Sequence, residues 1–319
     1  MGFSLIGTGS ATPSRTVTND ELSRLVDTSD AWIRTRTGVR ERHVLTDENL
    51  SDLVFRAGSA ALLDAGVQAG ELDLILCSTV RNDFMTPSMA CTLQKALGAT
   101  CIGMDINAAC SGFLYALDVA VSYFARGRVK KVLVVAAEAM SRLADWRDRA
   151  TCVLFGDGAG AVVLTEGDGL RSIRVTASGN TELLTIANVQ GNCPFTKSAP
   201  RDPFLYMNGP EVFKFAVSSM CQDLAFVIAE AGLKPEQIDY VLPHQANIRI
   251  IEAAKARLGI PDERFLCNMD RYGNTSSASI PILMDECNRA GRFKTGDLLA
   301  LSAFGGGLTT GACVLRWGK

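Results

Sequence analysis

Residues 102–117 read Ile102-Gly-Met-Asp-Ile-Asn-Ala-Ala-Cys-Ser-Gly-Phe-Leu-Tyr-Ala-Leu, a pattern that predicts a short strand, a tight turn and a long apolar helix. Cys110 falls where that helix begins. The unpaired N–H groups and the positive dipole end of a helix N-terminus stabilise a thiolate, so we expect Cys110 to have a depressed pKa and to be a nucleophile. Position alone leaves a second interpretation open, in which Cys110 is a small buried hydrophobic residue.

The surroundings of this stretch recur later in the chain. Residues 65–76 and 231–242 both read as a helix end closed by glycine, a short loop and a buried strand, at an offset of 166 residues. The pair Met104-Asp105 recurs as Met269-Asp270, at an offset of 165. Several matches at nearly one offset indicate two copies of one structural unit.

Each copy alternates apolar strands with longer helical patterns, and buried runs such as 131–137 suit central strands that are covered on both faces. We therefore expect an α/β fold of duplicated, layered αβαβα halves, 1–167 with the cysteine and 168–319 with the candidate histidine and asparagine. The seam carries no Pro/Gly/Ser linker, so the halves should pack as one rigid unit. Residues 180–210 lack periodicity and are expected to form a long functional loop.

The composition describes a soluble globular protein, because 47% of the 319 residues are hydrophobic and 32 basic residues balance 34 acidic ones. This balance gives no global drive toward nucleic acid. The N-terminus has no signal-peptide pattern and no run reaches about 18 apolar residues, so we expect a cytoplasmic protein without a membrane span. The ten cysteines form no Cys-x-x-Cys pair and there are two histidines, so we expect neither a zinc site nor disulfides.

Two further segments are candidates for chemistry. His244 lies at the end of a predicted strand and before a helix, where α/β proteins place their sites, whereas His43 lies in a charged segment and is interpreted as structural. Asn274 lies near the pseudo-symmetric counterpart of Cys110, so the two face one another if the halves pack about a two-fold axis. A role of Asn274 as a simple helix cap stays open.

Two glycine-rich segments have different interpretations. The glycines of Phe304-Gly-Gly-Gly let the backbone approach a ligand and aim N–H groups at an oxyanion, although a strand bend would use the same residues. Phe155-Gly-Asp-Gly-Ala-Gly has the spacing GxGxG and precedes a predicted strand, which argues against a dinucleotide fingerprint and a nicotinamide oxidoreductase.

With these residues combined, the chain resembles the β-ketoacyl-acyl-carrier-protein synthase III family, the initiating condensing enzymes of bacterial type II fatty acid synthesis, which have the thiolase fold. The resemblance extends over the whole chain. The motifs that carry it are Gly7-Thr-Gly-Ser, Asp27-Thr-Ser-Asp-Ala-Trp-Ile, Thr35-Arg-Thr-Gly-Val-Arg-Glu-Arg, Phe155-Gly-Asp-Gly-Ala-Gly-Ala, Pro243-His-Gln-Ala-Asn, Gly273-Asn-Thr-Ser and Ala303-Phe-Gly-Gly-Gly.

The resemblance implies a homodimer that condenses an acyl-coenzyme A primer with malonyl-acyl carrier protein and needs no metal or redox cofactor. It makes Cys110, His244 and Asn274 the catalytic triad, and the backbone N–H groups of Cys110 and Gly306 the oxyanion hole. The coenzyme A site would comprise Thr28, Trp32, Arg36, Arg149, Asn208, Gly209, Phe213, Ala246 and Asn247.

Docking of an acidic carrier protein needs a local basic patch. Arg249 and Arg257 fall at i and i+8 on one face of the helix after Asn247, and Lys214 and Lys255 add charge. A plain solvated helix face is the alternative.

Two departures from the family pattern concern the acyl channel. Thr86 stands where many members have Phe before the proline, and Thr310 stands where many have Trp. Both changes remove aromatic bulk, so we expect a longer or wider channel than acetyl requires. Two other functions stay open: a related thiolase-fold ketosynthase or acyltransferase of secondary metabolism, and a non-catalytic acyl-coenzyme A binding protein.

Overall fold

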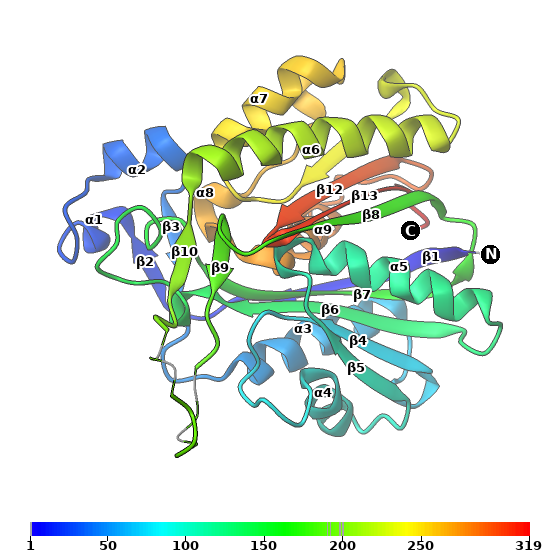
Figure 1. Cartoon of the computed structure of the whole chain (residues 1–319). Coiled ribbons are helices and arrows are strands. Elements are labelled where there is room, and N and C mark those ends of the chain that lie inside the picture. The colour runs from blue at the N-terminus through cyan, green and yellow to red at the C-terminus, as the bar shows by residue number, and fades with distance from the viewer. Residues whose placement is uncertain (1, 190, 192, 198, 200) are drawn as a thin grey trace.

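Two β-sheets form the body of the molecule (Figure 1). The computed structural model describes residues 2–189, 191, 193–197, 199 and 201–319. The first sheet contains, in spatial order, β1 (Gly2–Ala11), β7 (Asp157–Gly167), β6 (Lys131–Ala139), β4 (Leu74–Ser78) and β5 (Ile102–Ile106). The second contains β8 (Leu170–Asn180), β13 (Gly307–Arg316), β12 (Leu298–Gly305) and β11 (Tyr240–Pro243).

The two sheets share one strand plan. In the first, β4 is parallel to β6, while β6 and β1 are antiparallel to β7. In the second, β11 is parallel to β12, while β12 and β8 are antiparallel to β13. The fifth position differs, because β5 pairs with β4 over its whole length whereas Val241 of β11 makes a single bridge to Phe265. The duplication seen in the sequence is therefore present in the strand order, and we propose the boundary between the halves at residues 167 and 168.

Helices form three layers around these sheets (Figure 1). α3 (Leu50–Ala65) and α4 (Met89–Leu97) cover the outer face of the first sheet, and α6 (Gly209–Glu230) and α7 (Ile248–Leu258) cover that of the second. α5 (Gly112–Ala125) and α9 (Ser279–Arg289) lie between the sheets, and Phe113 and Leu117 of α5 share one core with Ile280 and Leu283 of α9. The αβαβα layering expected from the sequence is confirmed.

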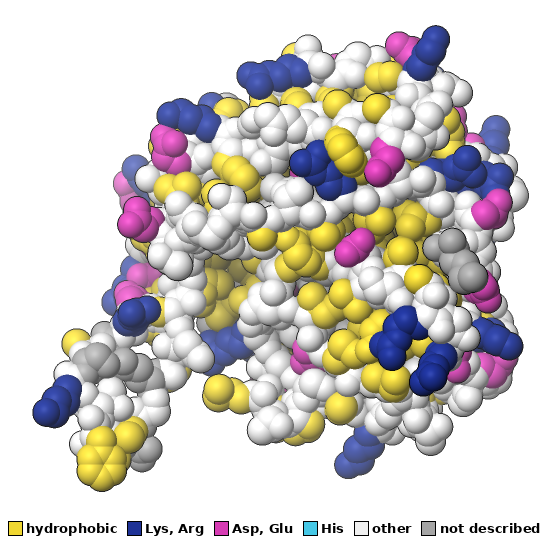
Figure 2. Space-filling view, turned by 45° about the vertical axis from the view of Figure 1, so that its right-hand side comes forward, with side chains coloured by type: hydrophobic (Ala, Val, Ile, Leu, Met, Phe, Trp, Pro, Cys, Tyr) yellow, Lys and Arg dark blue, Asp and Glu magenta, His cyan; other side chains and the backbone are white. Residues whose placement is uncertain are grey.

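Shorter elements complete the chain. They are β2 (Thr16–Thr18), α1 (Asn19–Leu22), α2 (Asp30–Thr37), β3 (Glu41–His43), β9 (Leu184–Ile186), β10 (Leu205–Met207), α8 (Met269–Tyr272) and the 3₁₀ turns η1 (Ala69–Glu71), η2 (Ala109–Ser111), η3 (Met140–Arg142), η4 (Pro235–Gln237), η5 (Asp262–Arg264) and η6 (Ser276–Ala278). The expectation of an irregular loop over 180–210 was incomplete, because β9 and β10 pair as a two-stranded sheet there. The described residues between them project from the body (Figures 1 and 2).

In the described part of the chain, α6 is the one helix long and apolar enough to cross a membrane. Its residues Val212, Ala216 and Leu224 are buried in one cluster with Ala300 of β12 and Val314 of β13. Core helices of globular proteins can be equally long and apolar, and α6 has the contacts of such a core helix.

The two ends of the chain lie beside the link between the halves. Gly2 of β1 pairs with Gly167 at the end of β7. The backbone N–H of Arg316, at the end of β13, donates to the Gly169 carbonyl at 2.7 Å. Figure 1 shows both termini on the same side of the molecule.

Close packing of α3 on β1 depends on glycine. A Cβ on Gly9 would lie 2.3 Å from the Ala57 carbonyl oxygen and 2.4 Å from the Ala61 nitrogen, both backbone atoms of α3. A Cβ on Gly179 in β8 would meet nothing within 4 Å.

We therefore expect Gly9→Ala to lower the free energy of unfolding by about 3 kcal/mol, because α3 must move off the sheet. Gly179→Ala should stay within about 0.5 kcal/mol of wild type. Urea titration of both variants measures the difference, and equal stabilities would contradict it.

Candidate active site

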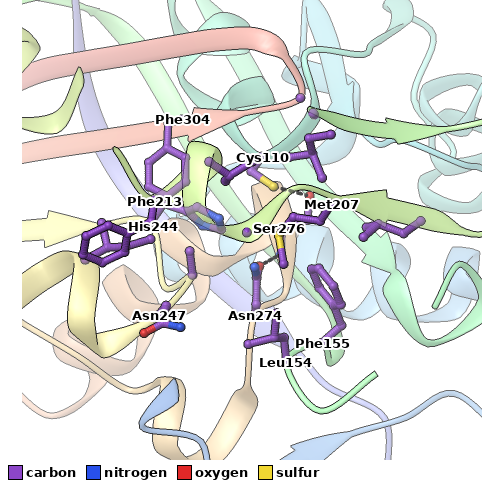
Figure 3. Close-up of a pocket in the computed structure, with 18 of the residues that line it drawn as sticks. Cys110, Leu154, Phe155, Met207, Phe213, His244, Asn247, Asn274, Ser276 and Phe304 are labelled. Atoms are coloured by element: carbon purple, nitrogen blue, oxygen red, sulfur yellow. Dashed lines mark hydrogen bonds between the residues drawn. The ribbon is translucent and has the colours of Figure 1, made fainter. Parts of the chain in front are cut away.

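A cavity of about 1060 Å³ is lined by residues of both halves. Cys110 comes from the first half, and His244 and Asn274 from the second, and all three line the cavity (Figure 3). The fold thus brings together the three residues that the sequence had singled out.

Cys110 lies in η2, between β5 and α5, as the sequence pattern predicted. The preceding residue, Ala109, has a φ of 48°, in the left-handed region that residues other than glycine rarely adopt. Its N–H donates to the Asn107 side-chain oxygen at 3.3 Å, which helps to hold the turn. This sharp turn aims the Cys110 side chain into the cavity rather than into the core.

The expectation of a depressed pKa at Cys110 is wrong. Burial raises the pKa of the thiol to about 12, and the hydrogen bond from Ser276 only partly offsets that effect. The loss of water around the sulfur outweighs the stabilisation that a helix N-terminus gives a thiolate. Cys110 is therefore a thiol at neutral pH, and its proton must leave when the sulfur attacks.

His244 follows β11 and is 1% exposed. Burial lowers the pKa of its imidazole to about 3, so the ring is neutral. Its Nδ1 lies 2.7 Å from the Ser279 hydroxyl, which accepts the N–H of Gln245 at 3.3 Å. We assign the hydroxyl proton to the bond with Nδ1, which leaves the ring N–H on Nε2 as a donor.

Asn274 is not an N-cap, since Thr275 and Ala278 hold that position for η6 and α9, but its side chain holds the turn before η6 and this orients its amide. Its Oδ1 accepts the N–H of Ser276 at 2.8 Å, so the Nδ2 group is left to face the cavity. The backbone is fixed as well, because its N–H donates to Leu154 and its carbonyl accepts from Gly156. Holding this turn and acting in the site are therefore compatible.

The triple glycine forms the turn between β12 and β13 and packs on η2. A Cβ on Gly305 would lie 2.6 Å from the Cys110 nitrogen, so this position excludes any side chain. Gly306 and Gly307 line the cavity. The strand bend and the close approach to the nucleophile are thus one feature.

Six of the nine residues expected to bind coenzyme A line the cavity: Trp32, Arg36, Gly209, Phe213, Ala246 and Asn247. The guanidinium carbons of Arg36 and Arg149 lie 5.9 and 5.5 Å from the centre of the Trp32 ring. This cationic and aromatic group suits an adenine nucleotide with phosphates.

The other three lie outside the lining. Arg149 donates to the backbone carbonyl and carboxylate of Asp27. Asn208 is the N-cap of α6. The Thr28 hydroxyl is buried and has no hydrogen-bond partner among the described residues.

The four expected docking residues differ in exposure and in distance from the cavity. Lys214 and Arg249 are exposed and line the cavity, and Arg249 lies 5.6 Å from the Phe213 ring centre. Arg257 is exposed farther along α7. Lys255 presents little charge, because its side chain is 14% exposed and pairs with Glu252.

The two residues expected at the acyl channel lie elsewhere in a single chain. Thr86 is exposed, next to Phe84 and Met85, which are 55% and 93% exposed. Thr310 is buried with its hydroxyl 2.7 Å from that of Thr176, and it is the neighbouring Thr309 that lines the cavity.

Sequence reasoning missed three residues at the site: Asn107, Ser276 and Glu138. Asn107 and Asn274 hold equivalent turns, each accepting the N–H two residues on, and Ser276 has a φ of 51° that matches Ala109. The offset of 167 between these turns would have revealed Asn107 and Ser276. Glu138 had a weaker signal, a lone acidic residue in an otherwise apolar strand.

The two like halves bring a thiol and an amide to the turns before their central helices, and an imidazole from the end of β11 beside them. This arrangement defines an acyltransferase of the thiolase fold. Family models described as 3-oxoacyl-(acyl-carrier-protein) synthase III match residues 104–180, and 228–317 for the C-terminal part. The chain belongs to the β-ketoacyl-(acyl-carrier-protein) synthase III family.

Individual relatives agree with this assignment over the full length. A β-ketoacyl-(acyl-carrier-protein) synthase III of Xanthomonas campestris pv. campestris is 48% identical, covering 98% of both chains. The crystal structure of 3-oxoacyl-(acyl-carrier-protein) synthase III from Aquifex aeolicus matches with a TM-score of 0.92 and 45% identity, over 99% of this chain and 100% of that one. A priming β-ketosynthase of a polyketide pathway matches with a TM-score of 0.93 but 34% identity, over 100% and 97%.

Proposed function

We propose that this protein catalyses, in the cytoplasm, the decarboxylative Claisen condensation of an acyl-coenzyme A primer with malonyl-acyl carrier protein, which initiates fatty acid biosynthesis. The observation that carries the proposal is the meeting of Cys110, His244 and Asn274 in one cavity that extends to Trp32 and Arg36. The names of the full-length relatives support the same reaction.

In the first half-reaction the Cys110 sulfur attacks the acyl thioester, and coenzyme A leaves. The developing oxyanion accepts the backbone N–H groups of Cys110 and Gly306, whose loops pack against each other through Gly305. Trp32, Arg36 and Arg149 would hold the adenine and phosphates, and Gly209, Phe213, Ala246 and Asn247 would line the path of the pantetheine arm.

In the second half-reaction malonyl-acyl carrier protein loses carbon dioxide and its enolate attacks the acyl group on Cys110. The enolate oxygen would accept the Nε2–H of neutral His244 and the Nδ2–H of Asn274. Both donors are fixed before the substrate arrives, His244 by Ser279 and Asn274 by Ser276, so little reorganisation opposes the step.

A homodimer fits the free edge of the first sheet. In the part of the chain that the structure describes, β5 pairs with β4 on one side only, and Ile102 on this edge strand is 52% exposed. An unprotected edge with an exposed apolar side chain is the kind of surface that pairs with another strand. In such a dimer the exposed Phe84, Met85 and Thr86 would be available to complete the acyl site of the partner.

The priming ketosynthase of polyketide pathways remains the second candidate, because it shares the fold over the full chain. Its identity of 34% is lower than the 48% of the fatty acid relative, and this difference favours fatty acid synthesis. A non-catalytic binding protein would retain bound acyl-coenzyme A without releasing free thiol.

The central test is the mass of the intact protein after incubation with acetyl-, medium-chain and branched acyl-coenzyme A. We expect one acyl group on Cys110, release of coenzyme A thiol, and no adduct in Cys110→Ala. Each methylene accommodated in a channel contributes about 0.8 kcal/mol, so longer primers should react with a higher kcat/KM than acetyl if Thr86 leaves the channel open. Thr86→Phe should reverse that order. Label on another of the ten cysteines, with Cys110 bare, would overturn the mechanism.

The two half-reactions should respond differently to loss of the enolate donors. His244→Ala and Asn274→Ala should slow malonyl decarboxylation by about 10²–10³-fold, because a preorganised donor is lost. Acylation of Cys110, followed by mass, should change far less. Normal decarboxylation in both variants would show that these residues do not hold the enolate.

Carrier docking should depend on the charge at the cavity mouth. Arg249→Glu should weaken the step with malonyl-acyl carrier protein more than tenfold, and more at low salt, because an acidic partner would meet a like charge. Acylation from small donors that lack the carrier should suffer less. Arg128→Glu makes the same charge change beyond the C-terminal end of α5, roughly 20 Å from its start, and should not matter. Equal loss with both donor types would indicate a different role for Arg249.

A further inference from the structure

The mechanism above makes no use of Glu138, a buried acid whose hydrogen bonds lead to the nucleophile. Glu138 lies in β6 and is 0% exposed. Its carboxylate accepts three hydrogen bonds, from the Val80 backbone N–H at 3.0 Å, the Ser277 hydroxyl at 2.7 Å and the Ser276 hydroxyl at 3.2 Å. Among the ion pairs of the described residues, none involves Glu138, so no cation holds this acid in its charged form.

Ser276 connects this acid to the nucleophile. Its hydroxyl oxygen lies 3.4 Å from the Cys110 sulfur and 3.2 Å from Glu138 Oε1. The hydroxyl has a single proton and two acceptor lone pairs. When it donates to the Glu138 carboxylate it can accept the Cys110 S–H, so thiol, hydroxyl and carboxylate form one chain.

The backbone holds Ser276 in this bridging position. Its φ of 51° is unfavourable for a residue with a side chain, and its N–H is fixed by the Asn274 side chain at 2.8 Å. A conformation of this kind persists where the surrounding structure maintains it, which occurs most often at functional sites.

We propose that Glu138 stores the proton of Cys110 between the two half-reactions and receives it through the Ser276 hydroxyl. This inference rests on the proposed function.

With Glu138 as the acceptor, every proton of the two half-reactions is accounted for. As the Cys110 sulfur forms its bond to the acyl carbon, the S–H proton passes to Ser276, and the Ser276 proton passes to Glu138 Oε1. Coenzyme A leaves with the electron pair of the broken C–S bond and takes one proton from water. In the condensation, the enolate carbon bonds to the acyl carbon and Cys110 leaves as a thiolate. Glu138 then returns the stored proton through Ser276, which regenerates the thiol and the carboxylate.

The electrostatics of the site suit such a store. Burial raises the pKa of Glu138 to about 7, whereas it lowers the pKa of His244 to about 3, so Glu138 is the better proton acceptor. The titratable group that faces Glu138 across Ser276 is Cys110. Asp157, beside the strand partner of Glu138, directs its carboxylate to Leu45 and Ser141 instead.

The test measures protons taken up during a single round of acylation, without malonyl-acyl carrier protein. A pH-indicator dye in weak buffer reports protons, and intact mass reports the acyl group on Cys110. At about pH 8 the wild type should take up about one proton per acyl-enzyme during the single round, because coenzyme A gains a proton while Glu138, which is fully buried, holds that of Cys110 out of exchange with water until the sulfur is free again. At about pH 6 uptake should vanish, because Glu138 is already protonated, and acylation should slow. Infrared difference spectra should show a protonated carboxyl in the acyl-enzyme.

Variants separate the store from a structural role. Glu138→Gln keeps the shape but cannot accept a proton, and Ser276→Ala breaks the chain while Glu138 remains. Both should acylate on the order of 10²-fold more slowly, without proton uptake. Ser277→Ala is the matched control: it removes another hydroxyl from Glu138 without touching the link to Cys110, so uptake should persist with its midpoint at higher pH. If Glu138→Gln fails to fold, the comparison of proton uptake between the wild type and Ser276→Ala tests the inference on its own.

Acylation without proton uptake in the wild type, or equal uptake in Glu138→Gln, would overturn the inference and leave the proposed function intact. Absence of any acyl group on Cys110 would instead overturn the proposed function.

Discussion

Burial of two apolar helices between two sheets is the constraint on which the rest of the structure depends. α9 is buried along most of its length, and α5 buries an apolar face with Phe113, Leu117 and Phe124 in the same core, so the two helices need both sheets, and one half of the chain supplies only one sheet. The halves must therefore pack together for either helix to be stable. Each of the two helices begins with a 3₁₀ turn, η2 before α5 and η6 before α9. These two turns lie against each other, and the cavity lies there.

The environment at that meeting point keeps charge off the groups that react. Burial raises the pKa of Cys110 to about 12 and lowers that of His244 to about 3, so thiol and imidazole are neutral at pH 7, while Glu138, with a pKa of about 7, is about half ionised. A low-dielectric site strengthens the hydrogen bonds that an oxyanion or enolate would receive. The same lack of water makes a free thiolate costly. The Cys110 thiol therefore needs a nearby group to accept its proton, whereas an exposed cysteine could lose the proton to water.

Much of this could be predicted from the sequence, because the informative signals were local or repeated. The strand–turn–helix around Cys110 follows from hydrophobic periodicity, and the duplication places Asn274 opposite it. The pKa of Cys110 could not be predicted, since it depends on how much water the second half of the chain excludes. The pairing of β9 with β10 was missed because each strand has only three residues, too few to show a period. Glu138 and Ser276 become partners only through contacts between residues 138 positions apart.

The position of the chain ends has a topological consequence. Gly2 pairs with Gly167, and Arg316 bonds to Gly169, so beginning, middle and end of the polypeptide converge on one corner. A short tether from residue 319 to residue 2, with new ends opened at residues 168 and 169, would reverse the order in which the halves are translated. Every strand would keep its neighbours, and the turns at Cys110 and Asn274 would be untouched. The packing of the two halves against each other therefore does not depend on which half comes first in the chain.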